Sequence, residues 1–167
     1  MTILRIIIIF FLFQVKSYSL IEVDITRGNL NPLPIAVSPL ATDKDSKQKF
    51  QNEVKVDDLG AEISKVVENN LMTSGLFNPL PKDSFLQEPD IAHFKPRFED
   101  WKLIKAQALI TGKVEYIDEK LRVEFRMWDV LAAKEIMALA FTTVPSNWRR
   151  VGPVSYTHLR AHETLTD

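Results

Sequence analysis

The C-terminal half of this chain carries three consecutive segments in which apolar and polar residues alternate, and this pattern restricts the possible folds most strongly. The segments cover residues 108–117, 121–127 and 136–144, and short turn stretches separate them at 118–120 and 131–134. In the middle segment the apolar positions are Leu121, Val123, Phe125 and Met127, with Arg122, Glu124 and Arg126 between them. A period of two predicts half-buried strands, and the short connections predict an antiparallel meander.

Four stretches upstream lack helical periodicity. Residues 34–37 predict a short buried strand, and residues 76–80 predict an extended segment. Residues 41–55 are polar and charged, which indicates a surface loop, and residues 87–96 form a second loop interrupted by prolines.

Helical spacing of apolar residues occurs in two other stretches. Residues 57–71 predict a helix with Asp57 or Asp58 as its N-cap, and residues 97–105 predict a shorter one. Ser146 is expected to cap a further helix that the following sequence does not continue. We therefore predict an α/β fold, a mixed β-sheet that ends in an antiparallel meander and is packed by two or three helices.

The N-terminus has the layout of a secretory signal peptide over residues 1–19. Arg5 precedes an unbroken apolar run at 6–13, and small residues stand at the expected cleavage positions Ser17 and Ser19. The apolar run is too short to cross a bilayer. The mature chain is therefore expected to begin near Leu20 and to lie outside the cytoplasm, with no membrane span after cleavage.

Composition excludes several classes of function. The 21 Lys and Arg residues balance 22 Asp and Glu residues, so no basic excess indicates binding to nucleic acid. The chain has no cysteine, and its five glycines form no phosphate-binding motif. The acidic pairs at 57–58 and 99–100 are expected to be helix N-terminal acids rather than catalytic pairs. These features predict a protein that is not an enzyme and has no cofactor.

The three histidines raise the question of a metal site. His158 and His162 are four residues apart, but a third ligand would have to come from His93, which stands in a predicted loop, or from one of the common carboxylates. Residues 153–167 resemble translated adapter sequence, and Pro153 interrupts the helix expected there. We therefore predict a non-native tail over 153–167 and no metal site. The alternative, a metal-dependent hydrolase that uses His158 and His162, is disfavoured.

The tryptophans offer another alternative. Trp101, Trp128 and Trp148 each stand among apolar neighbours, so core or edge packing is expected. If Trp101 or Trp128 were instead a ligand platform, the chain would be a stand-alone periplasmic α/β domain that binds a small ligand.

Several segments together are similar to one family. LIEVDITRGNLNPLPIAV, LGAEISKVVENNLMTSGLFNPL, RFEDWKLIKAQALITGKV and FRMWDVLAAKEIMALAFTTVPSNWRRVG resemble the N-terminal domain of the TolB family, closest to alphaproteobacterial members. The resemblance covers residues 21–152, so we expect the domain to span 20–152. In this family a six-bladed β-propeller follows and docks the lipoprotein Pal; the propeller is absent from this chain.

The resemblance also implies a function. TolB is a periplasmic, non-enzymatic scaffold of the Tol–Pal system, which supports outer-membrane integrity and constriction during cell division. Its first mature residues bind the inner-membrane protein TolA as an added strand, and the corresponding positions here are Ile21, Glu22, Val23, Asp24, Ile25, Thr26, Arg27 and Gly28. Residues 20–26 alternate in polarity and suit that role. The alternative, that they form an edge strand of their own sheet, stays open.

Overall fold

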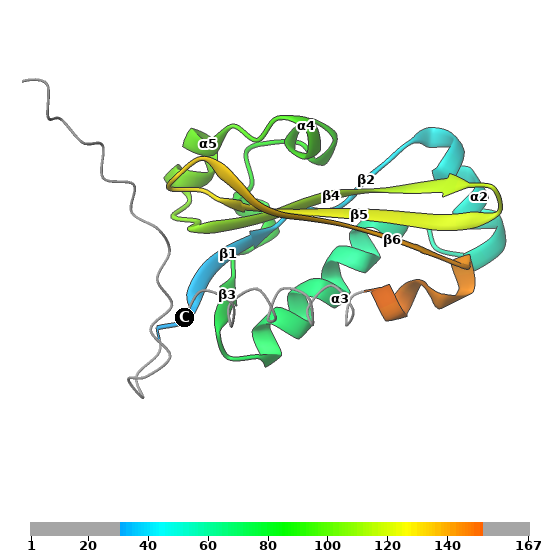
Figure 1. Ribbon diagram of the computed structural model, residues 1–167, viewed down its shortest axis with the longest axis horizontal. Coiled ribbons are helices and arrows are strands. Elements are labelled where there is room, and N and C mark those ends of the chain that lie inside the picture. The colour runs from blue at the N-terminus through cyan, green and yellow to red at the C-terminus, as the bar shows by residue number, and fades with distance from the viewer. Residues whose placement is uncertain (1–30, 152–167) are drawn as a thin grey trace, which may run out of the picture.

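The computed structural model describes residues 31–151, which form one mixed β-sheet with helices on both faces (Figure 1). The sheet has six strands in the order β3-β1-β4-β5-β6, and β2 pairs with β4 beyond the end of β1. Pairing of β1, β2, β3 and β4 is parallel, and β4, β5 and β6 form an antiparallel meander. The predicted fold class is confirmed. The strands are β1 Leu33–Val37, β2 Ala41–Thr42, β3 Phe77–Pro79, β4 Ala108–Ile117, β5 Lys120–Asp129 and β6 Lys134–Thr143.

The meander has the turn chemistry that its register requires. Asp118 and Glu119 connect β4 to β5 and have φ values of 50° and 58°. Two successive left-handed residues are typical of the hairpin turn whose twist matches that of the strands. In the second turn the Asp129 carboxylate accepts a hydrogen bond of 2.8 Å from the N–H of Ala132. Both turns lie where the alternation lapses in the sequence.

The helices divide between the two faces of the sheet (Figure 1). On one face α3 is the main covering element, and α2 and a C-terminal 3₁₀ helix, η2, pack beside it. On the other face the two short α-helices, α4 and α5, cover one end of the meander (Figure 1). The bounds are α2 Lys44–Val54, α3 Leu59–Thr73, η1 Lys82–Ser84, α4 Pro89–Phe94, α5 Phe98–Leu103 and η2 Pro145–Arg150.

Two apolar clusters follow from this arrangement. The larger lies between the sheet and α2, α3 and η2, and includes Ile35, Phe50 and Ile63. The smaller lies under α4 and α5 and consists of Ala36, Ala92, Trp101, Ala106, Leu109 and Val130. Because successive residues of a strand point to opposite faces, Ile35 enters one cluster and Ala36 the other. Strand β1 is therefore buried on both sides.

The prediction of a surface loop at 41–55 is wrong, because this stretch forms β2 and α2. The Asp43 side chain caps α2 by accepting a hydrogen bond of 2.9 Å from the N–H of Ser46. Ser46 and Phe50 are the buried residues of the helix, and Val54 packs partly against the same core. These three positions are four residues apart and form a narrow stripe on one helical face. The other residues are polar, which masked the helical pattern.

Two further expectations need correction, and two are confirmed. Residues 87–96 contain α4, with Pro89 in its first turn, where proline is favoured. Ser146 is not an N-cap, since Val144 holds that position and a 3₁₀ helix follows. The helix predicted from Asp58 is α3, and the helix predicted over 97–105 is α5. The strand predicted at 20–26 lies outside the described residues.

Candidate partner-binding surfaces

The residues predicted to bind TolA lie outside the part of the chain that the structure describes. Only residues 29–32 separate Gly28 from the first residue of β1, Leu33. A fully extended connection of this length spans at most about 18 Å. Strands β3 and β4 occupy both edges of β1. Any strand pairing made by 21–28 therefore requires an edge other than those of β1.

The two outer strands of the sheet differ in how well their edges are protected. Strand β3 has three residues and ends in Pro79, two features that disfavour pairing with another chain. Strand β6 has ten residues, and from Ile136 to Thr143 it carries no charged side chain. Within residues 31–151 it forms the opposite margin of the sheet. A long apolar margin is the kind of edge to which extended peptides bind.

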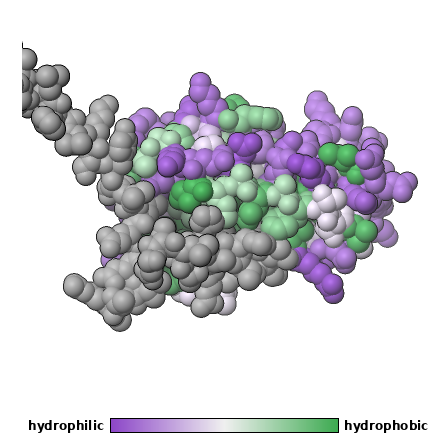
Figure 2. Space-filling model, viewed as in Figure 1, coloured by the Kyte–Doolittle hydropathy of each residue, from purple (hydrophilic) through white to green (hydrophobic). Residues whose placement is uncertain are grey.

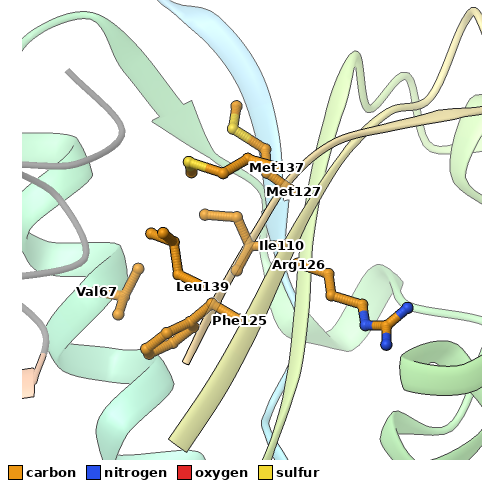
Figure 3. Close-up of a pocket in the computed structure, with 7 residues that line it drawn as sticks. All are labelled: Val67, Ile110, Phe125, Arg126, Met127, Met137 and Leu139. Atoms are coloured by element: carbon orange, nitrogen blue, oxygen red, sulfur yellow. The ribbon is translucent and has the colours of Figure 1, made fainter. Parts of the chain in front are cut away.

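A small apolar groove lies between α3 and the β5–β6 hairpin. It is open to solvent, and its cavity volume of about 10 Å³ has room for about one water molecule. Figure 3 shows that six apolar side chains turn toward this space, whereas Arg126 points away from it. Figure 2 shows apolar residues gathered across the same part of the molecule. The apolar lining consists of Val67, Ile110, Phe125, Met127, Met137 and Leu139.

This groove does not have the features of a small-ligand site. Ligand pockets combine an apolar lining with a few convergent polar groups that orient the ligand. Its one polar lining residue, Arg126, is paired with Glu135 at 3.2 Å on the opposite face. The groove therefore lacks both the volume and the polar groups of a small-ligand site.

The tryptophans are used for packing. Trp101 is only 1% exposed, and its indole Nε1 donates a hydrogen bond of 3.1 Å to Gln87. The Trp128 indole donates one of 2.9 Å to the Thr111 hydroxyl. Trp148 is buried in the larger cluster. These contacts leave the alternative of a tryptophan ligand platform without support.

The opposite face of the meander carries alternating charges. Glu124 accepts a hydrogen bond from Arg122 at 2.7 Å, and Lys113 bonds to Glu115 at 2.9 Å. Burial alone would raise the pKa of Glu124, but Arg122 and Lys113 outweigh it and the pKa is lowered. The same hydrogen bond to Glu124 raises the pKa of Arg122. Cations and carboxylates are paired one to one here, so this face offers no surplus charge for an anion or a metal.

The titratable groups singled out in the sequence have structural roles. Asp58 caps α3, accepting a hydrogen bond of 2.9 Å from the N–H of Ala61. Asp100 pairs with Arg97 at 2.7 Å, and Glu99 pairs with Lys102 at 3.0 Å. Among residues 31–151, no group of three His, Cys, Asp or Glu side chains is arranged to hold a metal ion. The pair at 158 and 162 lies outside those residues.

Three buried side-chain atoms within residues 31–151 lack a hydrogen-bond partner, Asn70 Nδ2, His93 Nδ1 and Trp148 Nε1, and of these residues only His93 titrates. It is 2% exposed, and its Nδ1 atom is buried without a hydrogen-bond partner. Burial lowers the pKa of His93, and the positive charges of Arg126 and Lys113 lower it further. The sequence placed this residue in a loop and gave no signal of its burial.

The sequence pattern also did not predict the groove beside β6. The alternation of Met137 and Leu139 predicted a buried face of β6, but not the element that packs against it. Residues on α3 and on the hairpin come together only through the order of the strands. Taken together, the fold and its surfaces define a mixed α/β domain with exposed apolar features suited to contact with other protein segments.

The family model described as the TolB amino-terminal domain matches residues 21–136. The chain therefore belongs to the TolB amino-terminal domain family. This family is non-enzymatic, which confirms the prediction that the chain is not an enzyme. No helix within residues 31–151 has the length and apolar character needed to span a membrane.

A curated relative agrees with this assignment, and a solved TolB structure has a similar fold. The Tol-Pal system protein TolB of Pelagibacter ubique is 71% identical over 147 residues, which is 88% of this chain. The chain spans about a third of the length of that relative, 33%. The crystal structure of TolB from Acinetobacter baumannii has a TM-score of 0.55 at 17% identity, covering 72% of this chain and 25% of that one. The C-terminal domain of LpoB from Salmonella enterica has a TM-score of 0.48 at 9% identity, covering 70% of this chain and 86% of that one.

Proposed function

We propose that this chain is the N-terminal domain of a non-enzymatic scaffold of the Tol–Pal system and that its residues 21–28 bind TolA. The observation that supports this most strongly is the family match, which begins at residue 21 and so includes the proposed binding segment. The name of the Pelagibacter relative, Tol-Pal system protein TolB, supports the assignment to the same system.

The mechanism we propose is strand addition. In residues 20–26, Ile21, Val23 and Ile25 alternate with Glu22, Asp24 and Thr26. Such a segment presents main-chain donors and acceptors along its edges and two chemically different faces. Pairing with an exposed sheet edge of TolA supplies affinity through the backbone, and the alternate side chains supply specificity. The short connection to β1 keeps the bound partner close to the domain.

The proposal extends to location and to the longer relatives. We propose that residues 1–19 direct export, that the mature domain spans 20–152 in the periplasm, and that residues 153–167 are non-native. In the longer relatives, contact with Pal belongs to the propeller beyond this domain. Linking TolA at the inner membrane to Pal at the outer membrane would support envelope integrity and constriction during division.

A binding experiment tests the site directly. Titration calorimetry of the exported chain against the C-terminal domain of the cognate TolA should show binding, and deletion of 20–28 should abolish it. Val23→Pro removes one main-chain donor and should weaken binding about tenfold or more, which corresponds to about 1.4 kcal/mol.

Val23→Thr is the matched control, because it keeps the main-chain donor and the β-branched shape. It should bind nearly as well as the unmodified chain. If TolA still bound after deletion of 20–28, the binding segment would have to lie elsewhere in the domain.

A further inference from the structure

Helix α4 is a short element that is held to the sheet mainly by two side chains. It packs on β4 and β2 with Ala92 and His93 facing inward. Ile91 and Phe94 face outward and are 54% and 77% exposed. A helix of six residues is too short to be stable on its own, so its position depends on the contacts of its inner face.

The remaining attachments of α4 are few and local. Gln87 donates a hydrogen bond of 2.9 Å to the Lys95 carbonyl and accepts one of 2.9 Å from the N–H of Arg97, which fixes the ends of the segment. Within residues 31–151, no ion pair joins α4 to the sheet. Ala92 and His93 therefore provide most of the contact that keeps the helix docked.

His93 is buried among charges that are already paired. The charged groups that act on it electrostatically are Lys113 and Glu115 from β4, and Glu124 and Arg126 from β5. Strand β2, which also packs against α4, contributes Ala41 and Thr42, neither of which titrates. The carboxylates bond to Lys113 and Arg122. A proton on the unpartnered Nδ1 atom would therefore place a third cation in this site without a hydrogen-bond acceptor.

We propose that α4 is a pH-sensitive element. It stays docked on β4 while His93 is neutral and detaches from the sheet when His93 is protonated. Release returns the imidazolium to water and separates it from Lys113 and Arg126. It also exposes the small apolar cluster around Ala92, Trp101 and Leu109. This proposal concerns the domain itself and does not depend on TolA binding.

The direction of the pH dependence follows from linkage. The docked form has a His93 pKa below the ordinary value of 6.5, and the released form has the ordinary value. The released form therefore binds more protons as the pH falls below 6.5. Docking is at full strength above that pH and weakens progressively below it. At pH 5.5 the ratio of released to docked α4 is at most about tenfold higher than above pH 6.5. This limit holds because pH 5.5 is one unit below the His93 pKa of the released form.

Hydrogen exchange read by mass spectrometry tests the proposal on the whole chain. After correction for intrinsic exchange rates, amides of residues 88–95 should exchange several-fold faster at pH 5.5 than at pH 7.5, up to about tenfold. Amides of β4 should show no comparable change. His93→Gln, which is polar and cannot acquire a proton, should exchange equally at both pH values.

An unchanged rate for residues 88–95 in the unmodified chain would overturn the proposal, as would an equal rise in His93→Gln. If His93→Gln is released at both pH values, His93→Phe decides the matter. Phenylalanine is apolar and cannot acquire a proton, so α4 should stay docked and residues 88–95 should exchange equally at both pH values. A pH response in His93→Phe would overturn the proposal.

Discussion

At the scale of single residues, the start of α3 is joined to the loop after β1 by contacts that leave no space for extra atoms. The Ser64 hydroxyl accepts a hydrogen bond of 3.0 Å from the N–H of Leu40 and lies 3.0 Å from the Ser38 carbonyl. A Cβ atom at Gly60 would overlap the Leu40 carbonyl oxygen and crowd Thr42. Glycine is required here for the close approach of two backbone segments.

Gly60→Ala is therefore expected to destabilise the domain, even though alanine favours helices. Overpacking of this kind typically costs about 1–3 kcal/mol. Urea unfolding followed by circular dichroism measures the loss of unfolding free energy. Ala61→Gly is the control, because it lowers helix propensity at the next position without adding an atom and should cost less, about 1 kcal/mol. Equal stability of Gly60→Ala and the unmodified chain would contradict the tight contact.

A second prediction concerns Tyr116, whose hydroxyl donates a hydrogen bond to the Glu53 carboxylate. This bond raises the pKa of Tyr116 to about 12. The pairing is favoured below the ordinary pKa of 10 and is lost as the pH rises toward 12. An absorbance titration at alkaline pH should resolve one tyrosine that ionises late. In Glu53→Gln its pKa should move back toward 10, and an unchanged titration would exclude Glu53 as the cause.

At the scale of elements, the structure shows which sequence signals were sufficient. The meander and α3 were predicted because each repeats one period over ten or more residues. Helix α2 was missed because only Ser46 and Phe50 are buried among its eleven residues. Helix α4 was missed because six residues flanked by prolines carry too little periodicity. The segment 21–28 was named from family resemblance, whereas the β6 groove depends on strand order, which local patterns do not encode.

The N-cap of α2 gives a prediction at this scale. Hydrogen bonds from Ser46 lower the pKa of Asp43, so the capped helix is stabilised above the ordinary pKa of 3.8 and loses that stabilisation as the pH falls below it. Asp43→Ala should cost about 1 kcal/mol at neutral pH. Asp45→Ala, in the first turn but not at the cap, should cost less. If the two variants lost equal stability in urea unfolding, the cap would not be the source of the effect.

At the scale of the whole molecule, the two edge strands of the sheet are protected unequally against pairing with another chain. The β6 margin and the adjoining groove expose apolar side chains, whereas β3 is short and ends in proline. Unprotected margins favour association between chains. The domain is therefore expected to self-associate at high concentration through β6.

A lysine placed on that margin should reduce association. Ala140 lies on the exposed side of β6, so Ala140→Lys adds a charge to the edge without disturbing the core. Light scattering coupled to size-exclusion chromatography should show a lower apparent mass than for the unmodified chain at the same high concentration. Asn78→Lys on β3 is the control and should leave the mass unchanged. Equal reduction by both variants would indicate a general effect of charge rather than pairing at β6.

The central position of β1 also has a consequence for how the chain is made. Ile35 pairs with Ala108, roughly seventy positions later in the chain, so the middle of the sheet is assembled from segments synthesised far apart in time. Until β4 has emerged from the ribosome, β1 has no neighbour on that edge. A pairing between segments so far apart in the chain is expected to form late in folding, after the local β4–β5–β6 meander.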